Sequence, residues 1–172
     1  AHAAGWIARV PRIASVQARG ANPFFQSFQR GFAERFTVKP ETVASAIRIG
    51  DPVSHDRARA VIQATHGVVV DVSDEEILAA KRCLDRSGIG CEPASACSLA
   101  GARVLRERGV IEPGSRVVGI LTGHLLTDPD AVMLSAPGAP SVEAQVLEGG
   151  ATLAEVMRVL EPALAASPGG AP

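Results

Sequence analysis

The chain has 172 residues, of which 47% are hydrophobic and 20% are charged, and its formal net charge is −1. This length suits one globular domain with a real core, and the composition is ordinary for such a domain. The sequence carries no basic cluster that would bind nucleic acid and no apolar run near the roughly 20 residues that a membrane span needs. Nucleic acids and membranes are therefore not expected partners.

The first part of the chain predicts a strand followed by helices. Residues 11–17 read as a short strand led by a proline. Residues 22–40 contain all five phenylalanines, and four of these repeat at a spacing of four, as on one face of a helix. We expect this face to pack on the core or on another subunit, with Gly31 kinking or ending the helix. Further helices are predicted at 40–50 and 55–65.

The middle of the chain predicts a strand and a well-capped helix. Residues 67–72 contain four valines, whose β-branched side chains predict a strand. Ser73 and Glu76 have the spacing of a capping box, so a helix is expected to start there and to stop at residues 87–88. Its side chains expected to point inward are Ile77, Ala80, Cys83 and Leu84.

Beyond this helix the pattern predicts one more helix and one more strand. Pro93 suits the first position of a helix that runs to Gly109. Residues 116–121 are again β-branched and predict a buried parallel strand, which ends at Thr122 and Gly123. Strands that alternate with helices predict an α/β fold, here a partial parallel, doubly wound sheet with helices on both faces.

The composition along the chain predicts four parts. Residues 1–135 form the α/β domain, 136–150 a Pro/Gly-rich linker, 151–166 a C-terminal helix and 167–172 a disordered tail. The cysteines, Cys83, Cys91 and Cys97, have no metal-ligand spacing and cannot all pair with one another. We therefore expect reduced thiols in a cytosolic protein and no metal site.

Three short segments place small or hydroxyl-bearing side chains at the ends of predicted elements. Thr122-Gly123 ends a strand, and ligands of open α/β sheets lie outside the carboxyl ends of strands. Residues 92–96, Glu-Pro-Ala-Ser-Ala, put a carboxylate and a hydroxyl at the start of a helix, and residues 44–46 open a helix without bulk. Each segment alone also has a structural explanation, as a turn, a common helix opening or a closely packed helix.

Taken together and in this order, the segments resemble the threonine synthases, which belong to the tryptophan-synthase-β-like class of pyridoxal-phosphate enzymes of fold type II. The likeness covers roughly residues 1–130, including residues 41–52, 72–77 and 88–96. It implies that the chain is the C-terminal part of an enzyme that converts O-phosphohomoserine and water to L-threonine and phosphate. It also implies pyridoxal 5'-phosphate as cofactor, a cytoplasmic location and a homodimer.

The resemblance implies roles for five residues. Thr122, with Gly123, would hydrogen-bond the pyridine nitrogen of the cofactor. A hydroxyl cannot hold that nitrogen protonated as an aspartate would, so the ring would be a milder electron sink. Ala46 matches a small residue that lies against the ring, and Glu92 and Ser95 match a helix start near its phenolic side. His124 is as consistent with a loop histidine as with a role in the site.

The resemblance also implies that the Schiff-base lysine and a Gly/Asn-rich phosphate loop precede the segment that matches Ala1. No catalytic residue is therefore expected in this chain. The two lysines are Lys39, beside Pro40, and Lys81, which we expect on the exposed side of a capped helix. Neither suits the buried amine of low pKa that the chemistry needs.

Because the sequence starts without Met, we expect the chain to begin partway through a longer protein. Without that lysine and loop, we expect it to be inactive alone. A partial sheet leaves an unpaired edge and uncovered apolar surface, so we also expect the chain to be poorly soluble or loosely packed. Two alternatives stay open. The chain could be part of another lyase with the same cofactor, such as threonine dehydratase or a cysteate-synthase-like enzyme. It could also be a non-catalytic, truncated partner of the full-length enzyme.

Overall fold

A computed structural model describes residues 1–128 and 152–165 of the chain. The chain divides into two compact units, Ala1–Ala131 and Val132–Pro172. In the second unit α6 (Leu153–Ala165) forms where the sequence predicts the C-terminal helix. The predicted linker and tail, 136–150 and 167–172, lie outside the described residues. Within the described residues, no helix has the length and apolar character that crossing a bilayer requires.

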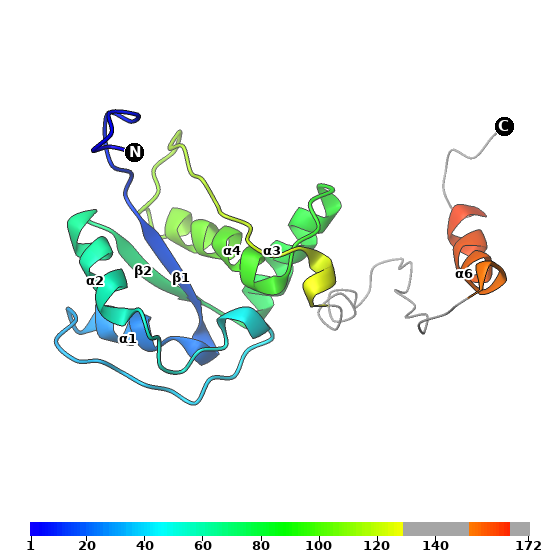
Figure 1. The fold of residues 1–172 in the computed structure, drawn as a ribbon, viewed down its shortest axis with the longest axis horizontal. Helices are drawn as coiled ribbons and strands as arrows, with labels where there is room; N and C mark the ends of the chain where they lie inside the picture. The colour runs from blue at the N-terminus through cyan, green and yellow to red at the C-terminus, as the bar shows by residue number, and fades with distance from the viewer. Residues whose placement is uncertain (129–151, 166–172) are drawn as a thin grey trace. The chain divides into compact units, whose positions relative to one another are not determined.

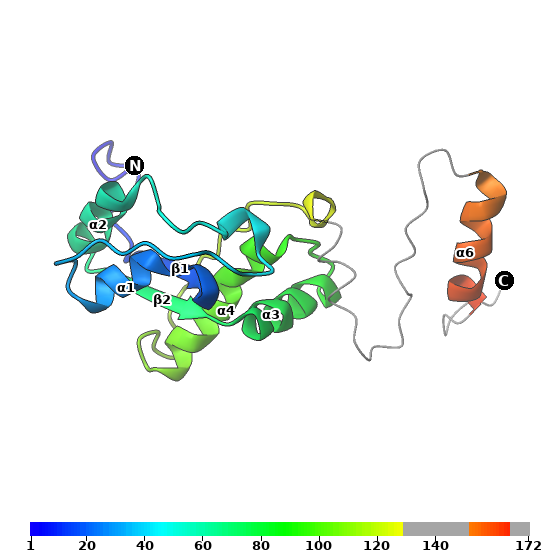
Figure 2. The same ribbon diagram turned by 90° about the horizontal axis from the view of Figure 1, so that it is seen from below.

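Two parallel strands form the sheet of the first unit. They are β1 (Ala14–Ala18) and β2 (Val68–Val72), paired from Ala14 with Val68 to Ala18 with Val72. Because successive side chains of a strand point to opposite faces, Val70 and Val72 enter one core cluster and Val69 enters the other. Helices cover both faces (Figure 2), so the α/β prediction is confirmed.

One face of the sheet is covered by α3 (Asp74–Arg86) and α4 (Pro93–Glu107). The predicted capping box is present, since Glu76 N–H donates to the Ser73 hydroxyl at 3.2 Å and Ser73 N–H donates to the Glu76 carboxylate at 2.6 Å. Ile77 is buried as predicted, but Cys83 is exposed, so its predicted inward position is wrong. Lys81, about one helical turn from Ile77, takes the inward side instead.

The other face is covered by α1 (Pro23–Gln29) and α2 (His55–Ala64). The helix predicted within 22–40 ends at Gln29, next to Gly31 as expected, because Gly31 and Phe32 adopt φ values of +62° and +63°. The chain folds back there, and the ring centroids of Phe24 and Phe32 still lie 5.3 Å apart. The aromatic side chains thus pack on the core as predicted, although not from one helix.

The predicted helix over 40–50 is reduced to a single 3-10 turn, η2 (Ser45–Ile47). Backbone donors of this stretch are used by distant groups rather than by a helical ladder. Glu41 N–H donates to the Gly20 carbonyl at 2.9 Å, and Val43 N–H donates to the Asp74 carboxylate at 3.1 Å. Tertiary hydrogen bonds therefore override the local preference for a helix.

The predicted strand over 116–121 is also wrong, since these residues have no regular structure. The segment runs back along α4 (Figure 1), where Gly119 faces Ser98, and it pairs with neither β1 nor β2. A strand needs a neighbour to satisfy its backbone groups, and none of the described residues supplies one here. Its apolar side chains consequently lie in solvent, with Val118 89% exposed and Ile120 73% exposed.

Candidate functional site

The Thr-Gly corner, defined as Thr122 and Gly123, lies at the amino-terminal end of α4. Glu92 is the residue that precedes this helix, Pro93 is its first residue, and Ser95 lies in its first turn. Proline suits this first position because its missing N–H would have no partner within the helix. Four of the five residues singled out from the sequence, Glu92, Ser95, Thr122 and Gly123, are thus brought together.

Ser95 holds the corner through its hydroxyl. The backbone N–H groups of Thr122 and Gly123 both donate to the Ser95 oxygen, each at 2.9 Å. Ser95 is 1% exposed, so its hydroxyl is fixed within the protein. The loop that carries Thr122 is consequently tied to the buried first turn of α4.

Glu92 closes the corner from the other side. Its backbone N–H donates to the Gly123 carbonyl at 3.1 Å. Its carboxylate accepts from the Thr122 hydroxyl at 3.3 Å and lies 3.2 Å from the Thr127 hydroxyl, which donates to the His124 carbonyl at 2.7 Å. A side chain at position 123 would displace this carboxyl group from its place beside the corner. Thr122 itself is an exposed residue, so a ligand can approach it.

Ala46 does not take part in these hydrogen bonds, but it lies in η2, which packs against α4. Its neighbour Ser45 donates to the Asp128 carboxylate at 2.8 Å, just after η3 (Leu125–Thr127). Ala46 is exposed, as a residue that lies against a ligand must be before binding. Whether any of the five residues contacts a cofactor stays a prediction.

Two residues near the corner were not predicted to support it. The Thr127 hydroxyl lies beside the Glu92 carboxylate at 3.2 Å, and Asp128, just after η3, accepts from Ser45 in η2. No local pattern marks them, because both contacts link positions far apart in the sequence. His124 has a structural part, since its Nδ1 accepts from Leu126 N–H at 3.3 Å and its backbone forms a bridge with Cys91.

Neither lysine belongs to the corner. Lys39 is exposed. The prediction that Lys81 is exposed is wrong, because it is 1% exposed and its amine donates to the Asp85 carboxylate at 2.8 Å. The ion pair between positions four apart on α3 allows the charge to be buried. Within the described ranges, no group of three or more His, Cys, Asp and Glu side chains could hold a metal ion.

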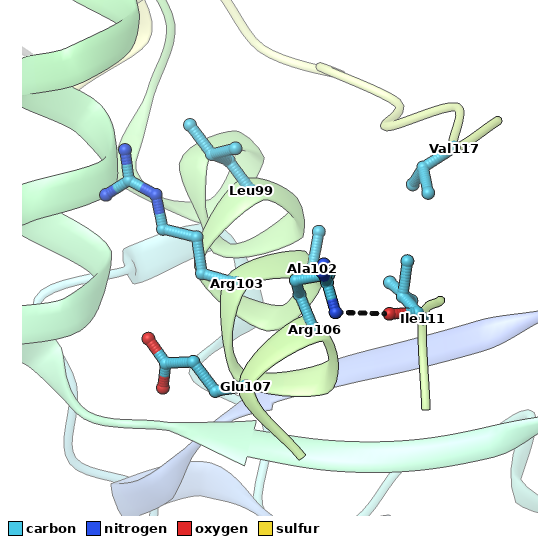
Figure 3. A pocket seen from close by; sticks show the side chains of 7 residues that line it. All are labelled: Leu99, Ala102, Arg103, Arg106, Glu107, Ile111 and Val117. Atoms are coloured by element: carbon cyan, nitrogen blue, oxygen red, sulfur yellow. Dashed lines mark hydrogen bonds between the residues drawn. The ribbon is translucent and has the colours of Figure 1, made fainter. Parts of the chain in front are cut away.

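A separate hollow of about 340 Å³ lies at the other end of α4 (Figure 3). It is bounded by Leu99, Ala102, Arg103, Arg106, Glu107, Ile111 and Val117. Arg106 spans its edge by donating to the Ile111 carbonyl at 3.3 Å. Because none of the five predicted site residues lines it, we place the candidate site at the Thr-Gly corner.

The cysteines are expected to differ sharply in reactivity. Burial raises the pKa of the Cys97 thiol from 9.0 to about 12, and the Asp74 carboxylate adds to the rise. Burial also raises the pKa of Cys91, whereas Cys83 is exposed. Because the thiolate is the reactive form, iodoacetamide at about pH 8 should modify Cys83 and spare the other two. Peptide mass spectrometry measures this.

The same shift predicts a pH dependence of stability. The pKa of Cys97 is higher in the folded protein than in the unfolded chain. The neutral thiol therefore stabilises the fold below pH 9.0, and this contribution is lost as the pH rises towards about 12.

The control for the iodoacetamide labelling is the same reaction in denaturant, which should modify all three cysteines. Modification of Cys97 as fast as Cys83 under native conditions would contradict the prediction.

Comparison with known proteins identifies the family to which the chain belongs. The sequence profile of a family described as pyridoxal-phosphate dependent enzyme matches residues 1–123. The chain belongs to this family. It is 44% identical over 131 residues to the threonine synthase of Methanocaldococcus jannaschii. The matched residues cover 75% of this chain and 32% of that protein. The threonine synthase of Methanosarcina acetivorans is 47% identical over 127 residues, covering 72% of this chain and 31% of that protein.

A solved structure supports the same fold. The threonine synthase from Escherichia coli superposes with a TM-score of 0.59 at 17% sequence identity, covering 87% of this chain and 32% of that chain. The resemblance to threonine synthases and the fold of this family are thus confirmed. The chain spans about a third of the length of the curated relatives it matches.

Proposed function

We propose that this chain supplies one wall of the cofactor site in an enzyme that converts O-phosphohomoserine and water to L-threonine and phosphate. The observation that carries the proposal is the convergence of Glu92, Ser95 and the Thr-Gly corner, which are distant in sequence, around one exposed hydroxyl. The relatives compared above are all named threonine synthase, which supports O-phosphohomoserine as substrate over the substrate of another lyase.

The corner suits the ring nitrogen of pyridoxal 5'-phosphate. When bound, this cofactor supplies an electron sink for carbanions formed on an amino-acid substrate. Thr122 would hold the ring nitrogen through its hydroxyl, and Ser95 and Glu92 would keep that hydroxyl in place. Ala46, which carries only a methyl group, would leave space for the flat ring. The small-residue turn and the fixed hydroxyl are the features of this chain that fit such a group.

We further propose that the Schiff-base lysine and the phosphate-binding loop come from sequence outside this chain. Lys39 is exposed and Lys81 is engaged with Asp85, so neither offers a free amine at the corner. On this proposal the isolated chain is inactive, and the full-length enzyme is a cytoplasmic homodimer. The three cysteines, all free, support a reducing compartment.

The test is an assay of the full-length protein that contains this chain. Purified enzyme should release phosphate from O-phosphohomoserine and form threonine, and should not release ammonia from threonine. Thr122→Val, which keeps the shape of the side chain and removes its hydroxyl, should lower kcat/KM roughly tenfold. That is the loss expected for one hydrogen bond worth about 1.5 kcal/mol.

Three outcomes would contradict parts of this proposal. Ammonia release from threonine without phosphate release would make the enzyme a dehydratase. Unchanged turnover and cofactor absorbance in Thr122→Val would remove Thr122 from the site. Finally, the coding DNA upstream of Ala1 should encode a lysine-bearing domain in frame. A stop codon and a start site there would favour a non-catalytic partner protein instead.

A further inference from the structure

The carboxylate of Asp74 serves a distant segment rather than the helix that it begins. Asp74 is the first residue of α3, but this end of the helix is capped by Ser73 and Glu76. The two oxygens of Asp74 instead accept from residues more than 30 positions earlier. The Thr42 hydroxyl donates to Oδ1 at 2.5 Å, and Val43 N–H donates to Oδ2 at 3.1 Å. The carboxylate therefore ties this segment to the start of α3.

The Thr42 hydroxyl extends this tie towards η2. An ionised carboxylate can only accept, so the Thr42 proton is donated to Asp74. The Thr42 oxygen then accepts from Ala44 N–H at 3.2 Å. Thr42 is 6% exposed and Ala44 is 0% exposed, so little water competes for these bonds. A buried chain of hydrogen bonds thus runs from Asp74 through Thr42 to Ala44, the residue that precedes η2.

The turn η2 has little support of its own. It is a single 3-10 turn of three residues, and the alanine that precedes it has no side-chain group to cap it. Ala44 packs in the core cluster, but apolar packing has no direction. The bond from Ser45 to Asp128 is exposed to water. The buried bonds to Asp74 are consequently the contacts that best fix the orientation of the turn.

We infer that Asp74 is a positioning residue that fixes the turn from which Ala46 contacts the cofactor ring. Ala46 lies in η2, three residues beyond Val43, and it is exposed. Displacing a positioning group by about 1 Å can cost about a hundredfold in rate, so a loosened turn has a large effect even at a distance. The inference rests on the proposed contact between Ala46 and the ring. In it, Asp74 itself contacts neither cofactor nor substrate.

The test uses the full-length enzyme, stripped of pyridoxal 5'-phosphate and then titrated with it. Asp74→Ala should raise the Kd for the cofactor roughly tenfold and change the visible circular dichroism of the bound ring. Hydrogen exchange of the Val43 and Ala44 amides in the apoenzyme should accelerate. Glu75→Ala is the matched control, because it removes the same charge from the same helical turn and leaves the bonds from Thr42 and Val43 in place. It should leave all three measurements unchanged.

Conservative variants separate the hydrogen bonds from the bulk of the side chains. Asp74→Asn has one acceptor oxygen in place of two, so its Kd should lie between those of wild type and Asp74→Ala. Thr42→Val removes the hydroxyl and should raise the Kd, whereas Thr42→Ser keeps the hydroxyl and should stay close to wild type. Because Thr42 and Asp74 act through one chain of bonds, Thr42→Val combined with Asp74→Ala should cost less than the sum of the two.

Ala46→Leu tests the proposed contact by itself, since a larger side chain would occupy the space of the ring. Wild-type cofactor binding in Ala46→Leu would make the contact and the inference fail together. If Ala46→Leu weakens binding and Asp74→Ala changes neither the Kd nor the circular dichroism, the inference is wrong and the contact stands. An equal loss of binding in Asp74→Ala and Glu75→Ala would assign the effect to the charge at the start of α3, which also overturns the inference.

Discussion

Replacing Ser95 with alanine is expected to release the Thr-Gly corner from α4. The variant removes the one oxygen that accepts from both Thr122 N–H and Gly123 N–H. Leaving a buried donor without its acceptor costs about 1–3 kcal/mol, and because Thr122 is exposed, water can take over part of this role, so we expect the total to stay within that range. Hydrogen exchange of these two amides in the full-length enzyme should accelerate by about ten- to a hundredfold.

Ser98→Ala is the matched control for this prediction. Ser98 lies one turn along the same helix, and its hydroxyl donates to the Ser95 carbonyl at 2.8 Å, within α4 itself. Its loss removes a hydroxyl of the same size without touching the amides of the corner. Cofactor affinity should fall in Ser95→Ala and not in Ser98→Ala. Equal exchange rates for the two amides in Ser95→Ala and wild type would show that another group holds the corner.

A side chain at Gly101 is expected to force α4 away from the sheet. A Cβ there would lie 2.7 Å from Val16 Cγ1 and 3.0 Å from Val16 Cβ, closer than carbon atoms approach without movement. Valine is branched at Cβ and stiff in a strand, so β1 cannot easily give way. Overpacking of this kind costs about 1–3 kcal/mol, and Gly101→Val should lower the thermal midpoint of the full-length enzyme by several degrees.

The neighbouring Ala102 provides the control, because it lines the hollow at the end of α4 and has room for extra methyl groups. Ala102→Val should cost less than about 0.7 kcal/mol, the difference in helix propensity. Gly101→Ala combined with Val16→Ala should recover part of the stability, since Val16→Ala removes the clashing methyl groups. Equal stability of Gly101→Val and Ala102→Val would contradict the close approach of α4 to β1.

Elements determined by local sequence were predicted well. The capping box of α3 and the β-branched run of β2 carry their signals within a few residues, and both elements form where expected. Elements that depend on distant partners were not. The 116–121 segment has the composition of a strand and lacks a paired neighbour among the described residues. The phenylalanine spacing does not reveal that Phe32 lies beyond the end of α1, although Gly31 was expected to kink or end that helix.

The candidate site divides in the same way. The residue types at Glu92, Ser95 and the Thr-Gly corner indicate where polar groups gather, and the structure brings them together. Their hydrogen bonds to one another, and the approach of the Thr127 hydroxyl to the Glu92 carboxylate, follow only from the packing of the corner on α4. The burial of Lys81 was not predicted. A lysine and an aspartate four residues apart on a helix, as Lys81 and Asp85 are, form an ion pair as readily on an exposed face as on a buried one.

The pairing of β1 with β2 has a consequence for the order of folding. Each of its pairs joins positions as distant along the chain as Ala14 and Val68, with α1 and α2 between them. Closing so long a loop costs chain entropy before any contact of the sheet forms, so topologies of this kind fold slowly. The helices α3 and α4 follow one another directly in the sequence, so their contacts close only short loops and are expected to form first. These helices then present the surface on which the two strands meet.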